Sequence, residues 1–319
     1  FWQLTNTSKA VNPDYVLTTR KLNLFLQINK SYRLIKKRLF IEDGFNNQTS
    51  YKNEPPKVIV KADDLALINF TSGSESIPKG ICRTHGFLIK QHKILQRCMK
   101  LKKNDTILTT LPVFVLSMLA AGSFVIIPKL KKNLPWLPNN QSLDLIKKNN
   151  VNIILGASAF VQELIKKSIE KDERFSSIKR VIIGGCFLEK DLIGKLKLIL
   201  PTKTSIEIIY GSTEVEPVSH INIDCLKDTW DKYSIHGYCV GKPINEVDAQ
   251  IIPFSKKPIK NSKLNFLTKG DFGELIVSGI HVNDRYVPHE PAFSDNKIIE
   301  VSGKLWHRMG DGAYYDKDD

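Results

Sequence analysis

The 319-residue sequence predicts an α/β protein with largely parallel sheets flanked by helices, followed by a smaller β-rich subdomain. Between residues 151 and 209, apolar runs typical of buried strands alternate with segments of helical spacing. Such alternation is typical of a parallel sheet covered by helices. After about residue 238, short strand-like runs are separated by turns. We therefore expect a partial N-terminal segment at 1–60, an α/β subdomain at 61–238 and a β-rich subdomain at 239–319.

Before residue 65, the hydrophobic pattern predicts secondary structure only weakly. Residues 45–56 are polar and contain paired prolines, which predicts a loop. Residues 65–70 (LALINF) predict a buried strand, which runs into a polar, turn-forming loop at 71–80. A helix is expected from about residue 84 to residue 99.

The stretch 106–128 carries no charge and is about as long as a membrane span. Pro112 and Pro128 bracket the run, Gly122-Ser123 interrupts it, and residues 106–110 and 124–127 are β-rich. We interpret the stretch as a strand at 106–110, a loop, a short helix and a buried strand at 124–127. No transmembrane span is expected, and contact with a membrane surface is left open.

The remaining elements follow in regular order. Strands are predicted at 151–155, 180–183 and 205–209, with helices at 159–169 and 188–200. Phe160, Leu164 and Ile165 would share one side of the first of these helices. Short strands are expected at 247–253, 273–278 and 297–301.

Charge and cysteine content limit the classes of partner. The formal net charge is +14, but the lysines are spread along the chain and no arginine-rich or aromatic-interleaved motif accompanies them. A solvated basic surface is therefore favoured over nucleic-acid binding. The five cysteines are odd in number and form no CxxC pair, which fits free thiols in the cytoplasm better than disulfides or a zinc site.

The loop at 71–80 (TSGSESIPKG) combines hydroxyls, glycine backbone and a lysine. These groups supply the N–H and O–H donors and the cation that a polyphosphate needs. The loop is not a Walker motif, because GxxxxGK[ST] is absent. By composition alone, such a loop is more often only a turn.

Two further motifs carry carboxylates. Residues 210–214 (YGSTE) place Glu214 where it would suit a hard cation that bridges phosphates, although the same residues could form a strand end and a helix cap. Residues 306–311 (WHRMGD) end on Asp311, whose two oxygens suit a vicinal diol. An aspartate in such a turn is otherwise ordinary turn chemistry.

Taken together, these motifs resemble those of the adenylate-forming superfamily, of the acyl-CoA synthetase and luciferase type. The loop at 71–80 is similar to its TSGSTGxPKG signature, and Thr84-His85 is similar to the TH pair that often follows. YGSTE resembles its YGxTE element, and WHRMGD resembles its GW..TGD element. The order and spacing of the motifs agree with this superfamily from about residue 60 onward.

The resemblance implies a role for each matching residue. Tyr210 would pack on adenine, Thr213 would contact the α-phosphate and act in catalysis with Glu214, and Glu214 would help to hold Mg²⁺. Asp311 would bind both ribose hydroxyls. The other implied nucleotide-binding residues are Thr71, Ser72, Gly73, Ser74 and Lys79 of the loop, Gly185 and Cys186 of an adenine-lining turn, and Gly211.

The implied activity is ATP-dependent adenylation of a carboxylic acid, with ATP and Mg²⁺ as cofactors and CoA left open. YGSTEVEPVS and WHRMGD are most similar to the β-lactone synthetases of bacterial olefin biosynthesis. These enzymes adenylate a β-hydroxy acid, so a fatty or β-hydroxy fatty acid is the expected substrate. Val115 replaces a histidine that many acyl- and aryl-CoA ligases carry.

Alternatives remain at this point. Glu75 and Ser76 replace the usual threonine and glycine of the loop, and an added carboxylate repels phosphate. A catalytically impaired nucleotide-binding protein is therefore the second hypothesis, and a nucleic-acid-binding protein is the third. His220 could face the acyl group or be structural. The resemblance also implies that the chain is the N-terminal large domain, with a hinge and a C-terminal lid expected beyond residue 319.

Overall fold

The computed structural model describes residues 2–35, 37–43, 58–71, 79–131, 134–138, 141–185, 190–226, 237–259, 264–288 and 297–316. The chain forms two compact units, one of residues 1–87 with 283–297 and one of residues 88–282 with 298–319. Each unit is described by itself. The three regions expected from the sequence follow other boundaries and stay a prediction, and the loop expected at 45–56 lies outside the described residues.

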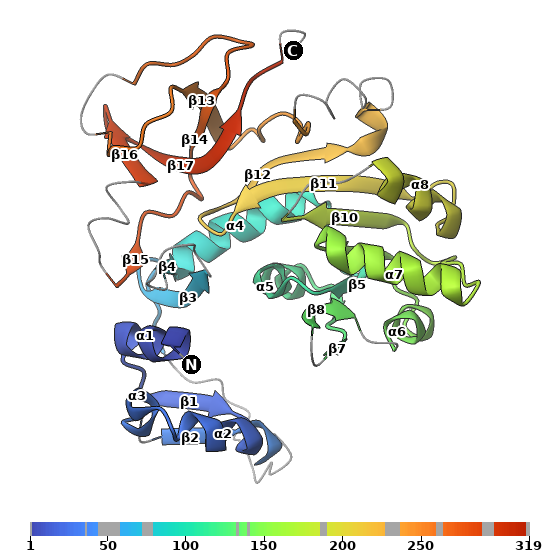
Figure 1. Cartoon of the computed structure of the whole chain (residues 1–319), viewed down its shortest axis with the longest axis horizontal. Helices are drawn as coiled ribbons and strands as arrows, with labels where there is room; N and C mark the ends of the chain where they lie inside the picture. Colours follow the sequence, from blue (N-terminus) through green and yellow to red (C-terminus); the bar gives the residue numbers. More distant parts are fainter. Residues whose placement is uncertain are drawn as a thin grey trace. The chain divides into compact units, whose positions relative to one another are not determined.

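The larger unit contains a six-stranded sheet of order β12-β11-β10-β9-β5-β6 (Figure 1). All neighbouring pairs are parallel except β11–β12, which is antiparallel. The strands are β5 (Thr106–Thr109), β6 (Phe124–Ile126), β9 (Ile153–Gly156), β10 (Arg180–Gly184), β11 (Ser205–Ser212) and β12 (Val215–Asn222). The predicted parallel α/β sheet is therefore confirmed.

Helices cover both faces of this sheet because its strands are apolar on both sides. The helices are α4 (His85–Cys98), α5 (Pro112–Ala120), α6 (Ser142–Lys148), α7 (Ser158–Glu170) and α8 (Lys190–Ile199). One buried cluster joins α6, α7 and α8 to the sheet, and it contains Phe160, Leu164 and Ile165, as the helical spacing predicts. A second cluster joins α4 and α5 to the other face, through Leu95, Phe114 and their neighbours.

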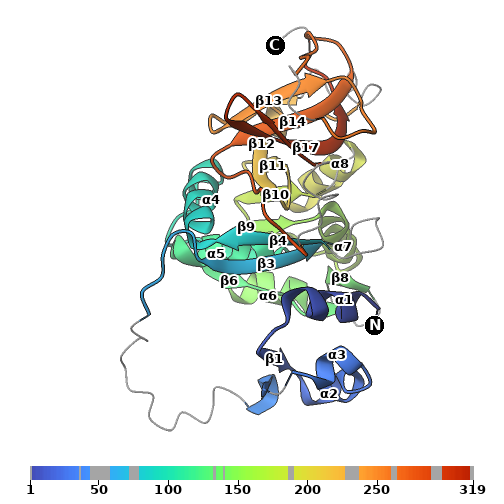
Figure 2. The ribbon, with the colours of Figure 1, turned by 90° about the vertical axis from the view of Figure 1, so that its left-hand side faces the viewer.

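The larger unit also contains a four-stranded antiparallel sheet of order β13-β14-β17-β16 (Figure 2), a short antiparallel pair of β7 (Leu130–Lys131) with β8 (Leu134–Pro138), and the 3-10 helix η2 (Ile223–Leu226). The strands of the four-stranded sheet are β13 (Val247–Ile252), β14 (Gly273–Gly279), β16 (Ile298–Val301) and β17 (Lys304–Ala313). Val215 and Val218 of β12 pack in one buried cluster with residues of β13, β14 and β17. This packing holds the second sheet against the β12 edge of the first. The second sheet is the smaller β-rich part that the sequence predicts after the parallel sheet.

The smaller unit holds the beginning of the chain and a short return segment. Its three-stranded antiparallel sheet has the order β15-β4-β3. A parallel pair, β1 with β2, lies earlier in the chain. The elements are α1 (Trp2–Val11), β1 (Tyr15–Thr18), α2 (Arg20–Leu26), α3 (Lys30–Arg33), β2 (Lys37–Phe40), the 3-10 helix η1 (Ile41–Asp43), β3 (Leu65–Thr71), β4 (Lys79–Thr84) and β15 (Tyr286–Val287).

Two strands predicted to be buried lie at sheet edges instead. β3 pairs only with β4, and Leu65 is 53% exposed. β6 ends the six-stranded sheet, and Phe124 is 60% exposed. An apolar run indicates strand propensity, but the number of neighbouring strands decides how much of it is buried. Within the described residues, no helix is long and apolar enough to span a membrane.

Candidate nucleotide-binding site

The YGSTE motif forms the tip of an antiparallel hairpin. Strand β11 continues through Tyr210 and Gly211 and ends at Ser212. Thr213 and Glu214 form the turn, and β12 begins at Val215. No helix follows the motif, so the helix-cap alternative is wrong. Ser212 has a buried hydroxyl oxygen without a hydrogen-bond partner among the described residues, which leaves a donor at the turn for a ligand oxygen or a water.

Gly211 is required by the close approach of the two strands. A Cβ atom at this position would lie 2.5 Å from the Val215 carbonyl oxygen and 3.3 Å from the Glu216 Cα. The pairing register also shifts between Tyr210 and Ser212, which marks a β-bulge. Bulges re-aim side chains and are frequent beside active sites.

Asp311 lies on β17, at a second irregularity of register. The pairing of β14 with β17 shifts between Glu274, opposite Gly312, and Ile276, opposite Arg308. Gly310 has a φ of 79°, in the left-handed region that favours glycine. The sequence reading of this motif as a simple turn is therefore incomplete, because the motif runs along a bulged strand.

The two motifs meet directly. The Tyr210 hydroxyl donates a 2.6 Å hydrogen bond to Asp311 Oδ2, across 101 residues of sequence. Burial raises the pKa of the Tyr210 phenol well above its usual range, and the hydrogen bond and negative charge of Asp311 raise it further. Tyr210 thus stays protonated at neutral pH and presents its aromatic ring together with the carboxylate.

The glycine turn after β10 is only partly described. Gly184 ends β10, and a Cβ there would lie 2.8 Å from Ile209 Cγ2, so β10 and β11 lie close together at this point. Gly185 has a φ of +77°, and no atom of the residues that the structure describes lies within 4 Å of where its Cβ would be. Cys186, the other residue predicted for this turn, lies outside the described residues.

The predicted phosphate loop belongs to the smaller unit. Thr71 ends β3 and Lys79 begins β4, so the loop connects an antiparallel hairpin and does not follow a strand of the parallel sheet. The Lys79 ammonium lies 3.9 Å from the centre of the Tyr286 ring. Ser72, Gly73 and Ser74 lie outside the described residues.

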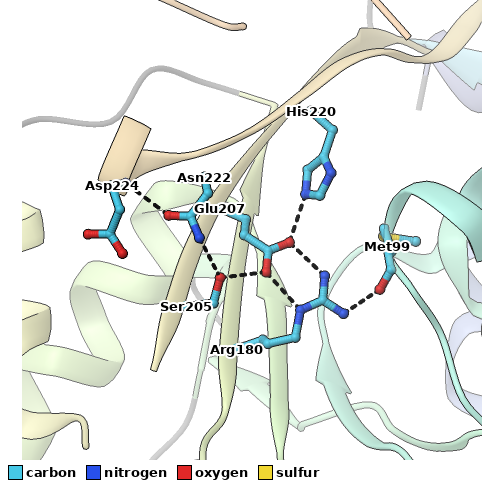
Figure 3. A network of polar contacts seen from close by, with 7 residues as sticks. All are labelled: Met99, Arg180, Ser205, Glu207, His220, Asn222 and Asp224. Carbon is cyan, nitrogen blue, oxygen red and sulfur yellow. Dashed lines mark hydrogen bonds and ion pairs between the residues drawn. The ribbon is translucent and has the colours of Figure 1, made fainter. Parts of the chain in front are cut away.

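The same strand, β11, carries a buried polar network around Glu207 that the sequence did not predict (Figure 3). The Glu207 carboxylate accepts from Arg180 Nε at 2.7 Å and Nη2 at 2.6 Å, from Ser205 Oγ at 2.8 Å and from His220 Nε2 at 2.7 Å. Arg180 also donates to the Met99 carbonyl at the end of α4. His220 is therefore a partner of Glu207, which favours its structural reading. The sequence did hold one sign of this network: Glu207 is a charged residue inside the otherwise mostly apolar run at 205–209 (SIEII).

Burial by itself would raise the pKa of Glu207, because a carboxylate loses its hydration inside a protein. The hydrogen bonds from Arg180 and His220, the Arg180 charge and the Ser205 hydroxyl together outweigh burial, and they hold this pKa well below its usual range. Glu207 is thus an ionised buried carboxylate at neutral pH.

The donor chemistry around the hairpin fits a magnesium ion held mainly by phosphates. Glu214 supplies one carboxylate at the turn. In the part of the chain that the structure describes, no group of three or more His, Cys, Asp or Glu side chains could hold a metal ion. Mg²⁺ commonly binds through one or two carboxylates together with substrate phosphates, so a dedicated protein cage is not required.

The fold is that of the large domain of adenylating enzymes. The structure of VinN matches 99% of the chain and 74% of its own length, with a TM-score of 0.75 and 16% identity. The AMPPNP-bound structure of a variant of the nonribosomal peptide synthetase FmoA3 matches 100% of the chain and 32% of its own length, with a TM-score of 0.81 and 18% identity. At these identities the similarity concerns the fold alone.

The sequence comparison is more specific. The model of the AMP-binding enzyme family matches residues 9–287, and the chain therefore belongs to this family. It is 28% identical over 264 residues to the olefin β-lactone synthetase of Xanthomonas campestris pv. campestris, covering 80% of the chain and 46% of that enzyme. It is 26% identical over 274 residues to 4-coumarate–CoA ligase 3 of Oryza sativa subsp. japonica, covering 82% and 45%. The chain spans about half the length of these relatives.

Proposed function

We propose that the protein containing this chain uses ATP to adenylate a carboxylic acid, and that the acid is a fatty or β-hydroxy fatty acid. The observation that carries the proposal is the hydrogen bond between Tyr210 and Asp311, which joins the YGSTE and WHRMGD motifs across 101 residues of sequence. Membership in the AMP-binding enzyme family supports it independently.

The proposed site distributes the parts of ATP among the motifs. Adenine packs on Tyr210 beside the Gly185 turn, and Asp311 accepts hydrogen bonds from the ribose hydroxyls. One oxygen of Asp311 already accepts from Tyr210, so the phenol fixes the orientation of the carboxylate. Thr213 at the hairpin turn provides a donor for the phosphates. The sequence motif of the loop at 71–80, with Lys79, is of the kind that supplies further donors and a cation to a polyphosphate.

The proposed reaction is in-line displacement at the α-phosphorus. A carboxylate oxygen of the acid bonds to this phosphorus, the bond to the bridging oxygen breaks, and pyrophosphate leaves with that electron pair. The products are acyl-AMP and pyrophosphate. Glu214 would hold Mg²⁺ together with the phosphates, and the ion would neutralise charge on the leaving group. The protein otherwise contributes positioning and charge stabilisation.

The relatives suggest two ways in which the acyl-adenylate could be consumed. In the manner of an olefin β-lactone synthetase, the β-hydroxyl of the same molecule attacks the acyl carbon, and AMP leaves. In the manner of a CoA ligase, the thiol of CoA attacks. We favour the lactone route, because β-lactone synthetases from two organisms match the chain at 28% identity, above the CoA ligase.

A pyrophosphate-release assay on the full-length gene product tests the proposal. We expect release with Mg·ATP only when an acid is present, with β-hydroxy fatty acids turning over without CoA. A requirement for CoA would redirect the proposal to a ligase. ATP binding without release on any acid would instead support the catalytically impaired alternative that Glu75 and Ser76 suggest.

A further inference from the structure

Both strands that meet at Tyr210 and Asp311 are paired irregularly at that point. From Tyr210 to Ser212, β11 advances two residues while its partner runs four, from Ser219 to Val215. From Glu274 to Ile276, β14 advances two residues while β17 runs four, from Gly312 to Arg308. Asp311 lies inside the second of these bulges.

A bulge locally interrupts the ladder of hydrogen bonds between two strands. A slip of one residue moves each side chain to the opposite face of a strand. A slip in β11 or β17 would separate the Tyr210 hydroxyl from Asp311. Contacts that join the paired strands beside each bulge would help to hold its register.

A buried ion bridge stands three residues before the first of these side chains. Glu207 is 6% exposed and is bound by Arg180 of β10 and His220 of β12. Three residues of strand span about 10 Å, and alternation places Glu207 and Tyr210 on opposite faces of β11. Glu207 therefore acts on the site through the strand and not by contact with a nucleotide.

A second bridge stands three residues before Asp311. Arg308 and Glu274 are each 6% exposed, and Arg308 Nη2 lies 2.5 Å from Glu274 Oε2. Arg308 Nε also donates to both oxygens of Glu274, at 3.0 and 3.1 Å. The bridge joins β17 to β14 at the bulge, because the register shift lies between the Glu274 and Arg308 pairings.

A buried ion pair is a poor source of stability, because desolvation offsets its attraction, and the specification of register is among its better-supported uses. We propose that Glu207 and Glu274 are positioning residues that lock the register of two bulged strands, so that Tyr210 and Asp311 meet. This inference rests on the proposed function only where it predicts an effect on ATP binding.

The test replaces the bridges without leaving unpaired charge. The double variants are Arg180→Met with Glu207→Leu, and Arg308→Met with Glu274→Leu. Glu207→Gln and Glu274→Gln keep the size of the side chain but leave the arginine without its counter-charge, and they serve as second variants should a double variant fail to fold. Leu164→Ala on α7 is the control, since it removes core packing on the α7 face of the sheet, away from both bridges. The measurements are local hydrogen–deuterium exchange and Mg·ATP affinity, both at a temperature where every variant is folded.

We expect each bridge variant to exchange at least tenfold faster only around its own bulge, at 210–219 or at 308–313, and to bind ATP at least fivefold more weakly. Leu164→Ala should instead speed exchange across the whole larger unit and keep its ATP affinity. Wild-type exchange at both bulges in the bridge variants would overturn the proposal. If the unmodified chain binds no ATP, the proposed function fails, and the exchange pattern alone decides the role of the bridges.

Discussion

At the residue scale, the pair of Tyr210 and Asp311 combines an aromatic face with an oriented carboxylate. The phenol is held protonated by burial and by the adjacent carboxylate. The hydroxyl donates to one oxygen of Asp311. Because this hydrogen bond fixes the orientation of the carboxylate, it also fixes the direction in which the other oxygen points. This is the arrangement that a ribose diol beside a stacked base requires.

Asp311→Ala should weaken Mg·ATP binding about tenfold or more, because losing hydrogen bonds to a charged acceptor costs about 1.5–3 kcal/mol. Isothermal titration calorimetry on the chain measures this loss. Tyr210→Phe should have a smaller effect, since it keeps the ring and loses only the orienting bond. The matched control is Tyr315→Phe, which removes a phenol donating to the Ala249 carbonyl at 2.9 Å and should leave affinity unchanged. Equal losses in the control would count against a role for the pair.

At the element scale, the β11–β12 hairpin decides where the YGSTE side chains lie. His281 supports its bulge from the neighbouring segment, donating from Nε2 to the Pro217 carbonyl oxygen at 2.8 Å. Burial lowers the pKa of His281, and this outweighs the hydrogen bond to Pro217, which acts in the other direction. A neutral histidine therefore helps to hold the irregular strand.

Gly211→Ala should destabilise the chain by about 1–3 kcal/mol, the usual cost of forcing atoms into a packed site. The added methyl would lie 2.5 Å from the Val215 carbonyl oxygen, so the hairpin must shift and ATP affinity should fall with it. Chemical denaturation and calorimetry measure the two effects. Gly194→Ala on α8 is the control, because nothing lies within 4 Å of its Cβ position and alanine favours helix. A Gly211→Ala chain as stable as the parent would refute the packing argument.

At the scale of the whole molecule, the buried carboxylate of Glu207 links the stability of the larger unit to pH. Its folded pKa lies well below the unfolded value of about 4.3. Such a group contributes stability that is fully present above the unfolded pKa and is lost as pH falls toward the folded one. The relevant window is therefore acidic, below about pH 5.

Glu207→Gln should be less stable than the parent by about 3 kcal/mol at pH 7, because it leaves Arg180 buried without its counter-charge. The two proteins should converge as pH falls below about 4, where the parent loses the same contribution. Urea denaturation at a series of pH values gives both curves. Asp191→Asn, at an exposed pair with Lys195, should show no such convergence. A constant difference between parent and Glu207→Gln from pH 7 to pH 3 would exclude the linkage.

The sequence by itself determined the parallel α/β sheet, the later strands β13, β14 and β16, and the motifs proposed for the site, whereas β17 was not predicted as a strand. Periodicity and turn residues are local signals, and strands such as β9 and β10 carry them within a few residues. The glycine and carboxylate chemistry of YGSTE and WHRMGD is likewise readable in place.

Only the tertiary structure decided that β3 and β6 lie at edges, that YGSTE turns a hairpin, and that Tyr210 reaches Asp311. It also paired Glu207 with Arg180 and His220, and Glu274 with Arg308. Each of these contacts joins different strands, and sheet pairing is set by packing over the whole chain. No local sequence pattern specifies which strands are buried, in which register they pair, or that two residues 101 positions apart form a hydrogen bond. The interactions that decide these features form only when distant strands come together.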